Sequence, residues 1–370
     1  MSMHRHIETM NAAPTTGGLE RLGWTSHFQN QMRPTRDAAS TPARVVGVRR
    51  NGFLVMNGDK AWRVTAAGRL RHQFQEAYPV VGDWVLTADT VITSVLERKN
   101  ALVRGAAGAR GRKDGRPASA QAMAANLDAV VIVCGLDRDF NLRRIERYLT
   151  LVYSCGMSPV LVLTKADLHP DPERFETTVA EVALGVPVQL VSSLDGRGLP
   201  ALAARLKPGE TATMIGSSGA GKSTLLNLLY GKALQATGDV SERVGKGKHI
   251  TTRRDLIVLP NGSMVIDNPG IREIAFWDDD AGLETAFPDI DRLAAGCRFS
   301  DCSHTREPGC RVLQAVDADE VSPGRLESFR KMKREMTYLS QRQHKSADRV
   351  EKERWKSVAV KIKTINKDRC

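Results

Sequence analysis

A glycine-rich segment at residues 216–223 has the spacing of a phosphate-binding loop. It reads Gly-Ser-Ser-Gly-Ala-Gly-Lys-Ser and matches G-x-x-x-x-G-K-[ST], between an apolar strand at 211–215 and a helix at 224–229. Glycines let backbone N–H groups turn inward around phosphate oxygens, and the helix N-terminus adds a favourable field. The lysine supplies positive charge to the β- and γ-phosphates, and the last serine ligates Mg²⁺. The pattern predicts a nucleoside triphosphate bound with Mg²⁺ by Gly216, Ser217, Ser218, Gly219, Ala220, Gly221, Lys222, Ser223 and Thr224.

Two elements upstream of this loop are predicted to select the base. Residues 164–167 read Thr-Lys-Ala-Asp after a strand at 159–163, and they resemble the [N/T]-K-x-D element of the GTPase superfamily. The Asp167 carboxylate can accept hydrogen bonds from guanine N1–H and N2–H₂, a donor pair that adenine lacks. A pair of serines after the next strand is similar to the Ser-Ala element that braces the base. The predicted guanine contacts are Thr164, Lys165, Ala166, Asp167, Ser192 and Ser193.

Downstream of the loop, residues 265–270 read Val-Ile-Asp-Asn-Pro-Gly and match D-x-x-G at a strand end. Asp267 is expected to hold Mg²⁺ through water, and the Gly270 N–H to sense the γ-phosphate. One threonine of the intervening segment should close on Mg²⁺ when the γ-phosphate is present. Thr252 is the first choice for that ligand and Thr251 the second.

The residue that positions the attacking water is not an obvious one. Many GTPases carry glutamine just after D-x-x-G, but here that position is Ile271, which cannot orient water. His249 is the local candidate, because its imidazole can accept a water proton near neutral pH. The alternative is that His249 contacts RNA or solvent. Slow intrinsic hydrolysis that a partner stimulates is therefore expected.

Three cysteines and one histidine form a second chemical pattern. Cys297-x₄-Cys302-x-His304-x₅-Cys310 offers three thiolates and one imidazole, a closed ligand set for a tetrahedral structural Zn²⁺. Zinc at this place would fold a segment that is too short to build its own core. The alternative is four unrelated residues. The cluster follows D-x-x-G by fewer than thirty residues, so nucleotide state is expected to act on it.

The elements that position these residues fall into distinct regions. Five short strands separated by turn residues predict a small barrel of the OB-fold type over 43–104, a shape often used to bind RNA. A structural barrel without RNA contacts is the alternative. Apolar strands alternating with helices over 128–276 predict a parallel sheet covered on both faces. The predicted strands lie at 44–48, 52–56, 61–64, 81–88 and 91–96 in the barrel, and at 128–133, 159–163, 187–191 and 211–215 in the sheet.

Charge distinguishes the ends of the chain from its middle. Residues 1–127 hold 18 Lys/Arg against 9 Asp/Glu, residues 128–329 hold 22 against 28, and residues 330–370 hold 14 against 5. An acidic catalytic core between two polyanion-binding ends is indicated, although basic tails can also serve solubility alone. The predicted regions outside the barrel and the sheet are a disordered 1–42, a basic linker 105–127, a helical zinc domain 277–340 and a basic tail 341–370.

The order of the motifs is itself informative, because the base-reading elements precede the phosphate loop. The sequence therefore encodes a circular permutation of a GTPase domain. The chain resembles the circularly permuted ribosome-biogenesis GTPases of the RsgA/YjeQ type. The resemblance lies in the order of its parts: barrel, TKAD, SS, GSSGAGKST, GKHITT, DNPG and the Cys/His cluster. The resemblance covers about residues 43–340. It departs from the family pattern at Ser193, Ile250 and Asn268, where alanine, threonine and threonine are usual.

This resemblance implies a protein with an OB-fold barrel, a central permuted P-loop α/β GTPase domain and a helical zinc domain. It implies GTP hydrolysis stimulated by the small ribosomal subunit, contact with its rRNA, and a late step in maturing that subunit. We expect a monomeric, cytoplasmic protein without a membrane partner. The competing functions are a metabolic P-loop kinase or ATPase, which TKAD disfavours, and an RNA-binding scaffold without hydrolysis, which Lys222, Ser223 and Asp267 disfavour.

Overall fold

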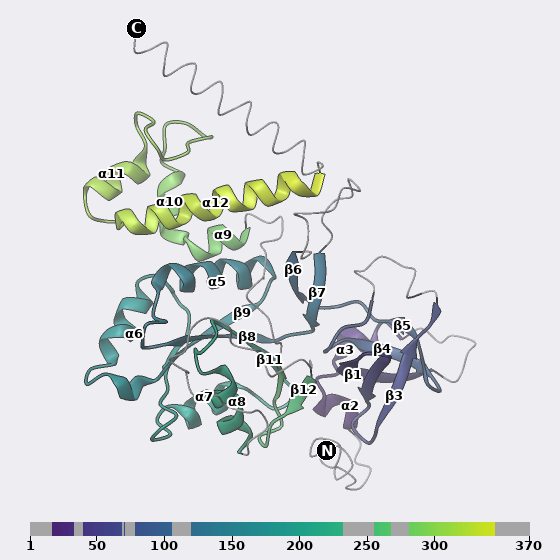
Figure 1. Ribbon diagram of the computed structural model, residues 1–370. Coiled ribbons are helices and arrows are strands. Elements are labelled where there is room, and N and C mark those ends of the chain that lie inside the picture. The colour runs from purple at the N-terminus through teal and green to yellow at the C-terminus, as the bar shows by residue number, and fades with distance from the viewer. Residues whose placement is uncertain are drawn as a thin grey trace.

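The computed structural model describes residues 17–32, 40–68, 70, 78–105, 120–231, 255–267 and 281–344. Three regions follow one another along the chain: a small barrel, an α/β domain built on a sheet, and a set of helices stacked on one helix of that domain (Figure 1). This architecture confirms the multidomain fold that the sequence predicts. Among the described helices, none is both long enough and apolar enough to cross a membrane.

In the described part of the barrel there are five strands, and their order closes on itself. Successive neighbours are β1, β2, β3, β5 and β4, and β4 pairs back with β1. All of these pairings are antiparallel except that of β3 with β5. Alternate side chains point inward, as the period-two pattern requires, so that Val45, Val55, Val64, Val85 and Ile92 form a buried core. The strands are β1 Thr41–Arg49, β2 Gly52–Met56, β3 Ala61–Ala66, β4 Trp84–Ala88 and β5 Val91–Val95.

The segment before the barrel is folded over part of its length, which corrects the prediction of disorder over 1–42. Two short helices, α2 Gly18–Arg21 and α3 Ser26–Gln29, lie against the barrel. The Trp24 and Trp84 rings meet edge to face with centroids 4.7 Å apart, and Phe28 is buried. A few large aromatic residues supply this core without helical periodicity, so the sequence pattern does not reveal it. Residues 1–16 lie outside the described ones.

Part of the predicted linker 105–127 is also a strand. β6 Ala101–Gly105 and β7 Ala120–Ala125 pair antiparallel as a separate two-stranded sheet, and the residues between them lie outside the described ones. Met123 and its alanine neighbours in β7 are buried. Small apolar side chains fit here because the hairpin packs closely, whereas an alanine-rich sequence reads as flexible when taken alone.

A buried arginine joins the barrel to the α/β domain. Arg44 of β1 donates to the carbonyls of Leu22, Gly82 and Asn126, and its guanidinium lies 5.6 Å from the centroid of the Trp84 ring. Burial lowers the pKa of Arg44 to about 10, against the opposing effect of nearby carboxylates. Three separate segments thus share one buried cation, which fixes the barrel relative to the first residues of the α/β domain.

Among the residues that the structure describes, the α/β domain contributes six strands to the sheet, and the phosphate-loop strand lies inside this set. The strand order is β10-β9-β8-β11-β13-β12, and every pairing is parallel except that of β12 with β13. The described pairings therefore confirm a mainly parallel sheet. The antiparallel edge strand β12 was not predicted. The strands are β8 Ala129–Gly135, β9 Ser158–Thr164, β10 Val188–Leu190, β11 Thr211–Ile215, β12 Asp255–Val258 and β13 Met264–Asp267.

Helices cover both faces of this sheet (Figure 1). Even- and odd-numbered residues of β8 separate into two cores: Val130 and Ile132 pack with helix α5, and Val131 and Val133 pack in the core that includes α7 and α8. The helices are α5 Leu142–Ser154, α6 Glu173–Ala180, α7 Leu199–Arg205 and α8 Lys222–Tyr230, with a 3₁₀ helix at Ala166–Leu168.

The barrel and the α/β sheet meet at one edge. Gly47 of β1 is bridged to Asp255 of β12, and the Asp255 carboxylate pairs with Arg49 at 2.5 Å. Gly47 leaves room for this pair, because a Cβ there would lie 2.5 Å from the Asp255 carboxylate oxygen. The contact links the barrel to the strand that follows residues 245–252, the predicted switch segment.

The third region is helical, as predicted. Its helices α9 and α12 lie along α5 of the α/β domain, and α11 packs against α10 (Figure 1). Gly282 in α9 permits this close approach, since a Cβ there would lie 2.5 Å from the Ser154 backbone nitrogen. The helices are α9 Ala281–Ala286, α10 Pro288–Ala294, α11 Arg311–Asp317 and α12 Pro323–His344.

Candidate functional site

The glycine-rich loop connects β11 to α8, the context that its motif requires. β11 ends at Ile215 and α8 begins at Lys222. Gly216 has φ 147°, and a Cβ at this position would lie 2.2 Å from the Val133 carbonyl oxygen. Gly221 has φ 93°. Only glycine adopts these conformations without strain, so the loop follows a path that a side chain would block.

The lysine of the motif bends back over the start of the loop. Lys222 Nζ donates to the Gly216 carbonyl at 2.9 Å and to the Ser217 carbonyl. Ser223 follows in the first turn of α8, where the helix N-terminus favours negative charge. The motif residues predicted to bind phosphate and Mg²⁺ are therefore gathered around one turn of backbone.

The predicted base-reading loop lies directly against this turn. Thr164 ends β9, and its hydroxyl donates to the Ala220 carbonyl inside the phosphate loop at 2.7 Å. Thr164 is buried, so this hydrogen bond is shielded from water. The two motifs are 56 residues apart in the sequence but share a hydrogen bond because β9 and β11 both flank β8.

The next residue adopts an unusual backbone conformation. Lys165 has φ 61°, in the left-handed region, and its ammonium group pairs with Asp137 at 2.6 Å. Asp167 follows on the 3₁₀ helix and is exposed to solvent. Burial alone would raise the pKa of Asp137, but the hydrogen bonds from Lys165 and the Asp139 N–H, with the charge of Lys165, lower it below its usual value.

The serine pair forms the neighbouring loop after β10. Ser192 is buried, and its hydroxyl accepts the N–H groups of Leu194 at 3.2 Å and Asp195 at 3.3 Å. Ser193 is exposed next to it. The Ala166 N–H donates to the Val191 carbonyl at 3.2 Å, which holds the two base-reading loops together. Ser192 thus stabilises the loop after β10 from inside, and the Ser193 side chain is accessible to solvent.

The structure describes the magnesium residues only in part. Asp267 ends β13, which runs parallel to β11, so it lies at the same edge of the sheet as the phosphate loop. The remaining predicted switch residues lie outside the described ones. They are His249, Thr251, Thr252 and Gly270.

Two acidic residues that the sequence analysis passed over also belong to this site. Asp137 and Asp139 lie in the loop between β8 and α5, and they contact Lys165 and Ser217 respectively. The sequence contains a pattern that could have pointed to them, because an Asp-x-Asp follows directly after an apolar strand at the carboxyl edge of a parallel sheet. The role of this pattern depends on β8 lying between β9 and β11, and the strand order cannot be read from the sequence.

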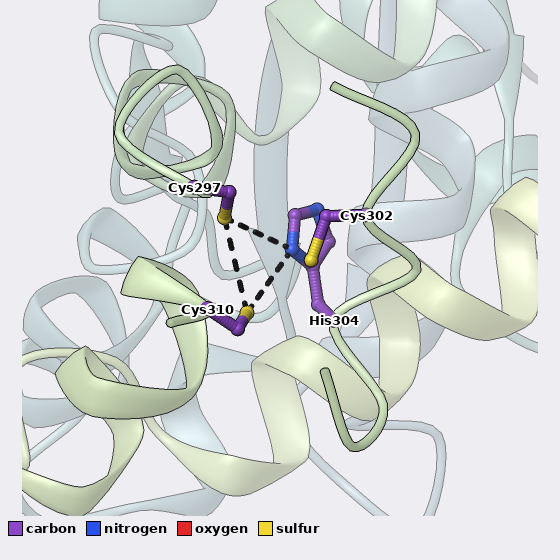
Figure 2. Close-up of side chains that lie close together, drawn as sticks. All are labelled: Cys297, Cys302, His304 and Cys310. Atoms are coloured by element: carbon purple, nitrogen blue, oxygen red, sulfur yellow. Dashed lines mark hydrogen bonds between the residues drawn. The ribbon is translucent and has the colours of Figure 1, made fainter. Parts of the chain in front are cut away.

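The four predicted zinc ligands converge, as Figure 2 shows. Their ligand atoms all lie within 4.8 Å of one another. Cys297 Sγ lies 3.8 Å from Cys310 Sγ and 3.6 Å from His304 Nδ1, and Cys310 Sγ lies 3.4 Å from the same nitrogen. Tetrahedral zinc has bonds of about 2.3 Å to sulfur and about 2.0 Å to nitrogen. This geometry places two sulfur ligands about 3.8 Å apart, and a sulfur and a nitrogen ligand about 3.5 Å apart. The four residues therefore fit a structural zinc ion, including Cys302.

The start of helix α11 favours the thiolate form of Cys297. Cys310 caps the helix, and its sulfur accepts the Leu313 N–H at 3.4 Å. Burial raises the pKa of Cys297, but the N–H groups of Val312 and Arg311 outweigh that effect and lower it. A helix N-terminus stabilises negative charge, and zinc takes thiolates rather than thiols.

A buried ionic network attaches the third region, helices α9–α12, to the α/β domain; this region is called the zinc-binding region below. Arg325 of α12 pairs with Glu146 of α5 at 3.0 Å and with Asp289 of α10 at 2.6 Å. The Arg325 side chain is 6% exposed and that of Glu146 is 0% exposed. Arg143 adds a second cation to Glu146 at 3.0 Å. Helix α5, which begins beside the nucleotide loops, is thereby held to α10 and α12.

With this geometry established, comparisons with known proteins identify the family. Residues 95–277 match the family model of the RsgA GTPase. The small ribosomal subunit biogenesis GTPase RsgA of Syntrophotalea carbinolica is 42% identical over 347 residues, which span 92% of this chain and 95% of that relative. The chain belongs to the RsgA GTPase family. Its enzymatic class is accordingly that of a GTP hydrolase, and the family resemblance inferred from the motifs is confirmed.

Two solved structures share the fold of this RsgA family member. YjeQ from Thermotoga maritima superposes with a TM-score of 0.58 at 29% identity, covering 80% of this chain and 99% of that one. YloQ, a circularly permuted GTPase, superposes with a TM-score of 0.57 at 26% identity, covering 84% and 99%. The likeness to YloQ confirms the circular permutation that the motif order indicates.

Proposed function

We propose that this chain binds and hydrolyses GTP on the small ribosomal subunit, contacts its rRNA and assists its late maturation. The relative from Syntrophotalea carbinolica is named a small ribosomal subunit biogenesis GTPase. The observation that carries the proposal is the 2.7 Å hydrogen bond from Thr164 to Ala220, which joins the base-reading and phosphate-binding loops into one site. The protein acts in the cytoplasm as a monomer.

The chemistry of the site follows from its residues. Backbone N–H groups of Gly216–Thr224 surround the phosphates, and Lys222 releases its two carbonyl contacts to meet the β- and γ-oxygens. Ser223 and Asp267 would hold Mg²⁺, Asp267 through water, and the ion would offset the negative charge of the phosphates. Thr252 would join these ligands in the GTP state, with Thr251 as the alternative.

Other groups bind the guanine base and activate the attacking water. The Asp167 carboxylate accepts two guanine N–H groups, while Lys165, held by Asp137, lies along the base plane. Gly270 senses the γ-phosphate. His249 accepts a proton from the attacking water, and the ribosomal partner stimulates this hydrolysis.

The barrel offers a surface suited to RNA. In OB-folds, the second and third strands and the loop between the first two often carry the ligand. Here the exposed Arg50 lies in that loop, and Arg63 is exposed on β3. Lys60 lies 5.5 Å from the centroid of the Trp62 ring on the same strand. Cations beside a partly exposed aromatic ring suit phosphate contact and base stacking.

A second basic surface lies on the zinc-binding region. Lys331, Lys333 and Arg334 are exposed on helix α12. Residues 330–370 hold 14 Lys/Arg against 5 Asp/Glu. The buried Arg325 network ties α12 to α5, which begins beside the nucleotide loops. This arrangement supports coupling between nucleotide state and the zinc-binding region on the subunit.

Replacing Asp167 with asparagine tests the assignment of the base-reading loop. The amide offers a donor where guanine needs an acceptor, but it matches xanthine, which carries a carbonyl at C2. We expect the Kd for GTP to rise at least about a hundredfold, while xanthosine triphosphate binds more tightly than it does to the wild type. Asp171→Asn, an exposed neighbour, is the matched control. An Asp167→Asn protein that still prefers GTP would contradict the assignment.

Charge reversal on α12 tests the RNA surface. Lys331→Glu with Lys333→Glu is expected to weaken co-sedimentation with small ribosomal subunits and to reduce its salt dependence, because two phosphate contacts are lost. GTP affinity should not change. Glu327→Gln, an exposed change on the same helix, is the control. Unchanged co-sedimentation at every salt concentration would argue against this surface.

A further inference from the structure

The loop between β8 and α5, residues 136–140, contacts both halves of the nucleotide site. On the base side, Asp137 pairs with Lys165 at 2.6 Å, and His169 Nε2 lies 2.6 Å from the Leu136 carbonyl oxygen. On the phosphate side, Asp139 reaches the glycine-rich loop. The loop therefore lies where it can fix the spacing between the two sets of nucleotide contacts.

Asp139 is the centre of the contacts on the phosphate side. Its carboxylate accepts the hydroxyl of Ser217, the N–H of Gly135 at 3.3 Å, and a guanidinium N–H of Arg144 at 2.6 Å. The side chain is 14% exposed. One carboxylate thus joins the end of β8, the phosphate loop and the first turn of α5.

Ser217 is held at both of its ends. Its hydroxyl donates to Asp139, and its carbonyl accepts the ammonium group of Lys222. Its side chain therefore makes a contact within the protein and does not serve as a phosphate ligand in this arrangement. Fixing Ser217 fixes the direction of the backbone N–H groups that follow it, and these are the groups that bind phosphate.

Arg144 makes it possible for a carboxylate to lie so close to a site for an anion. Asp139 alone would repel the phosphates, whereas the adjacent guanidinium offsets its charge. Arg144 also donates to the Asp139 backbone carbonyl, so it holds the loop as well as the carboxylate. Asn141 caps the helix by accepting the Arg144 N–H at 3.1 Å, which places this arginine in the first turn of α5.

We propose that Asp139 is a positioning residue for the nucleotide: it preorganises the phosphate loop through Ser217 and fixes that loop to helix α5 through Arg144. The inference rests on the proposed assignment of residues 216–224 as the phosphate site. Because the contact acts on the loop that binds the phosphates common to GTP and GDP, it strengthens binding of both nucleotides. A contact of this kind changes KM and leaves kcat nearly unchanged.

Binding of GTP and GDP to full-length variants tests the proposal. Asp139→Ala and Ser217→Ala are each expected to raise both Kd values about tenfold, in line with the loss of a hydrogen bond to a charged group. Asp139→Asn keeps an acceptor oxygen and should lie between the wild type and Asp139→Ala. The double variant should bind no more weakly than the weaker single one, because both changes break the same link. Single-turnover hydrolysis at saturating GTP should fall less than about threefold.

Controls separate this proposal from its premise. Glu181→Gln, an exposed change at the end of α6, should bind both nucleotides like the wild type. Ser217→Ala removes one hydroxyl only, so it tests the link even where Asp139→Ala fails to fold. Additive effects in the double variant, or single variants within twofold of the wild type, would overturn the role of Asp139. If Lys222→Ala also bound GTP normally, the phosphate-loop assignment itself would be at fault.

Discussion

Replacing Arg325 with methionine is expected to loosen the attachment of the zinc-binding region to the GTPase domain. Methionine keeps an unbranched apolar stem against the Phe287 ring, whose centroid lies 4.6 Å from the Arg325 guanidinium. The charge, however, is lost. Glu146 has a side chain that is 0% exposed, and of its two arginine partners among the described residues it would then keep Arg143, which is 45% exposed.

The magnitude follows from this burial. Removing one partner of a buried ion pair costs about 3–5 kcal/mol, because the other charge stays desolvated. The same interface offers a matched control: Arg147 pairs with Glu335, and their side chains are 37% and 32% exposed. Arg147→Met should cost at most about 1 kcal/mol, since a pair that stays partly accessible to water gains little over its hydration. Both variants remove an arginine that links α5 to α12, and Arg325 in addition pairs with Asp289 of α10.

Hydrogen exchange of zinc-loaded protein measures the difference. Amides of α12 should exchange faster in Arg325→Met by a factor equivalent to about 3–5 kcal/mol of local opening, and those in Arg147→Met nearly as in the wild type. Adding Glu146→Leu to Arg325→Met should recover part of the loss, because no buried charge then remains on α5. Equal protection in the two single variants would refute the reasoning that burial decides the strength of this attachment.

Three further changes have defined outcomes. Gly216→Ala should weaken GTP binding by about ten- to a hundredfold, since its Cβ would lie 2.2 Å from a backbone carbonyl oxygen; unchanged binding, measured by fluorescent-nucleotide titration, would contradict the loop geometry. Removal of zinc by a chelator should unprotect the amides of residues 297–317 while GTP affinity of the isolated protein changes less than about twofold; protection that survives chelation would argue against a structural metal. Burial raises the pKa of Asp289, but the hydrogen bonds and charge of Arg325 outweigh it and lower that pKa below its usual value. The ionised carboxylate therefore stabilises the attachment at neutral pH, and this stabilisation is lost as pH falls below about 4. Asp289→Asn should remove that acid sensitivity in a thermal melt followed from pH 7 to 3, and an unaltered pH profile would count against it.

Local patterns in the sequence account for much of the fold. The sequence predicts the strand before the phosphate loop at 211–215, and the structure has it as Thr211–Ile215, because an apolar run followed by a glycine-rich loop permits few alternatives. The zinc ligands were predicted from spacing, and they converge since fourteen residues of chain can close on one ion. The barrel strands were found from their turns and their alternation.

Features that depend on distant contacts could not be found in this way. Arg325 and Glu146 are 179 residues apart, and neither stands out from other charged residues in a helix. Asp139 acquires its role only when β8 lies beside β11. The folded segment at 17–32 is stabilised by aromatic residues that pack on the barrel, such as Phe28 against Trp84 at 5.7 Å. In each case the partner, and not the local pattern, defines the role.

The central claim is that this member of the RsgA family is a GTPase whose activity responds to the small ribosomal subunit. The direct measurement is the rate of GTP hydrolysis by the full chain, with and without purified small subunits, at one concentration of each. We predict slow hydrolysis alone, at least about tenfold stimulation by the subunit, and loss of both activities in Lys222→Ala. A rate that small subunits leave unchanged would contradict the claim.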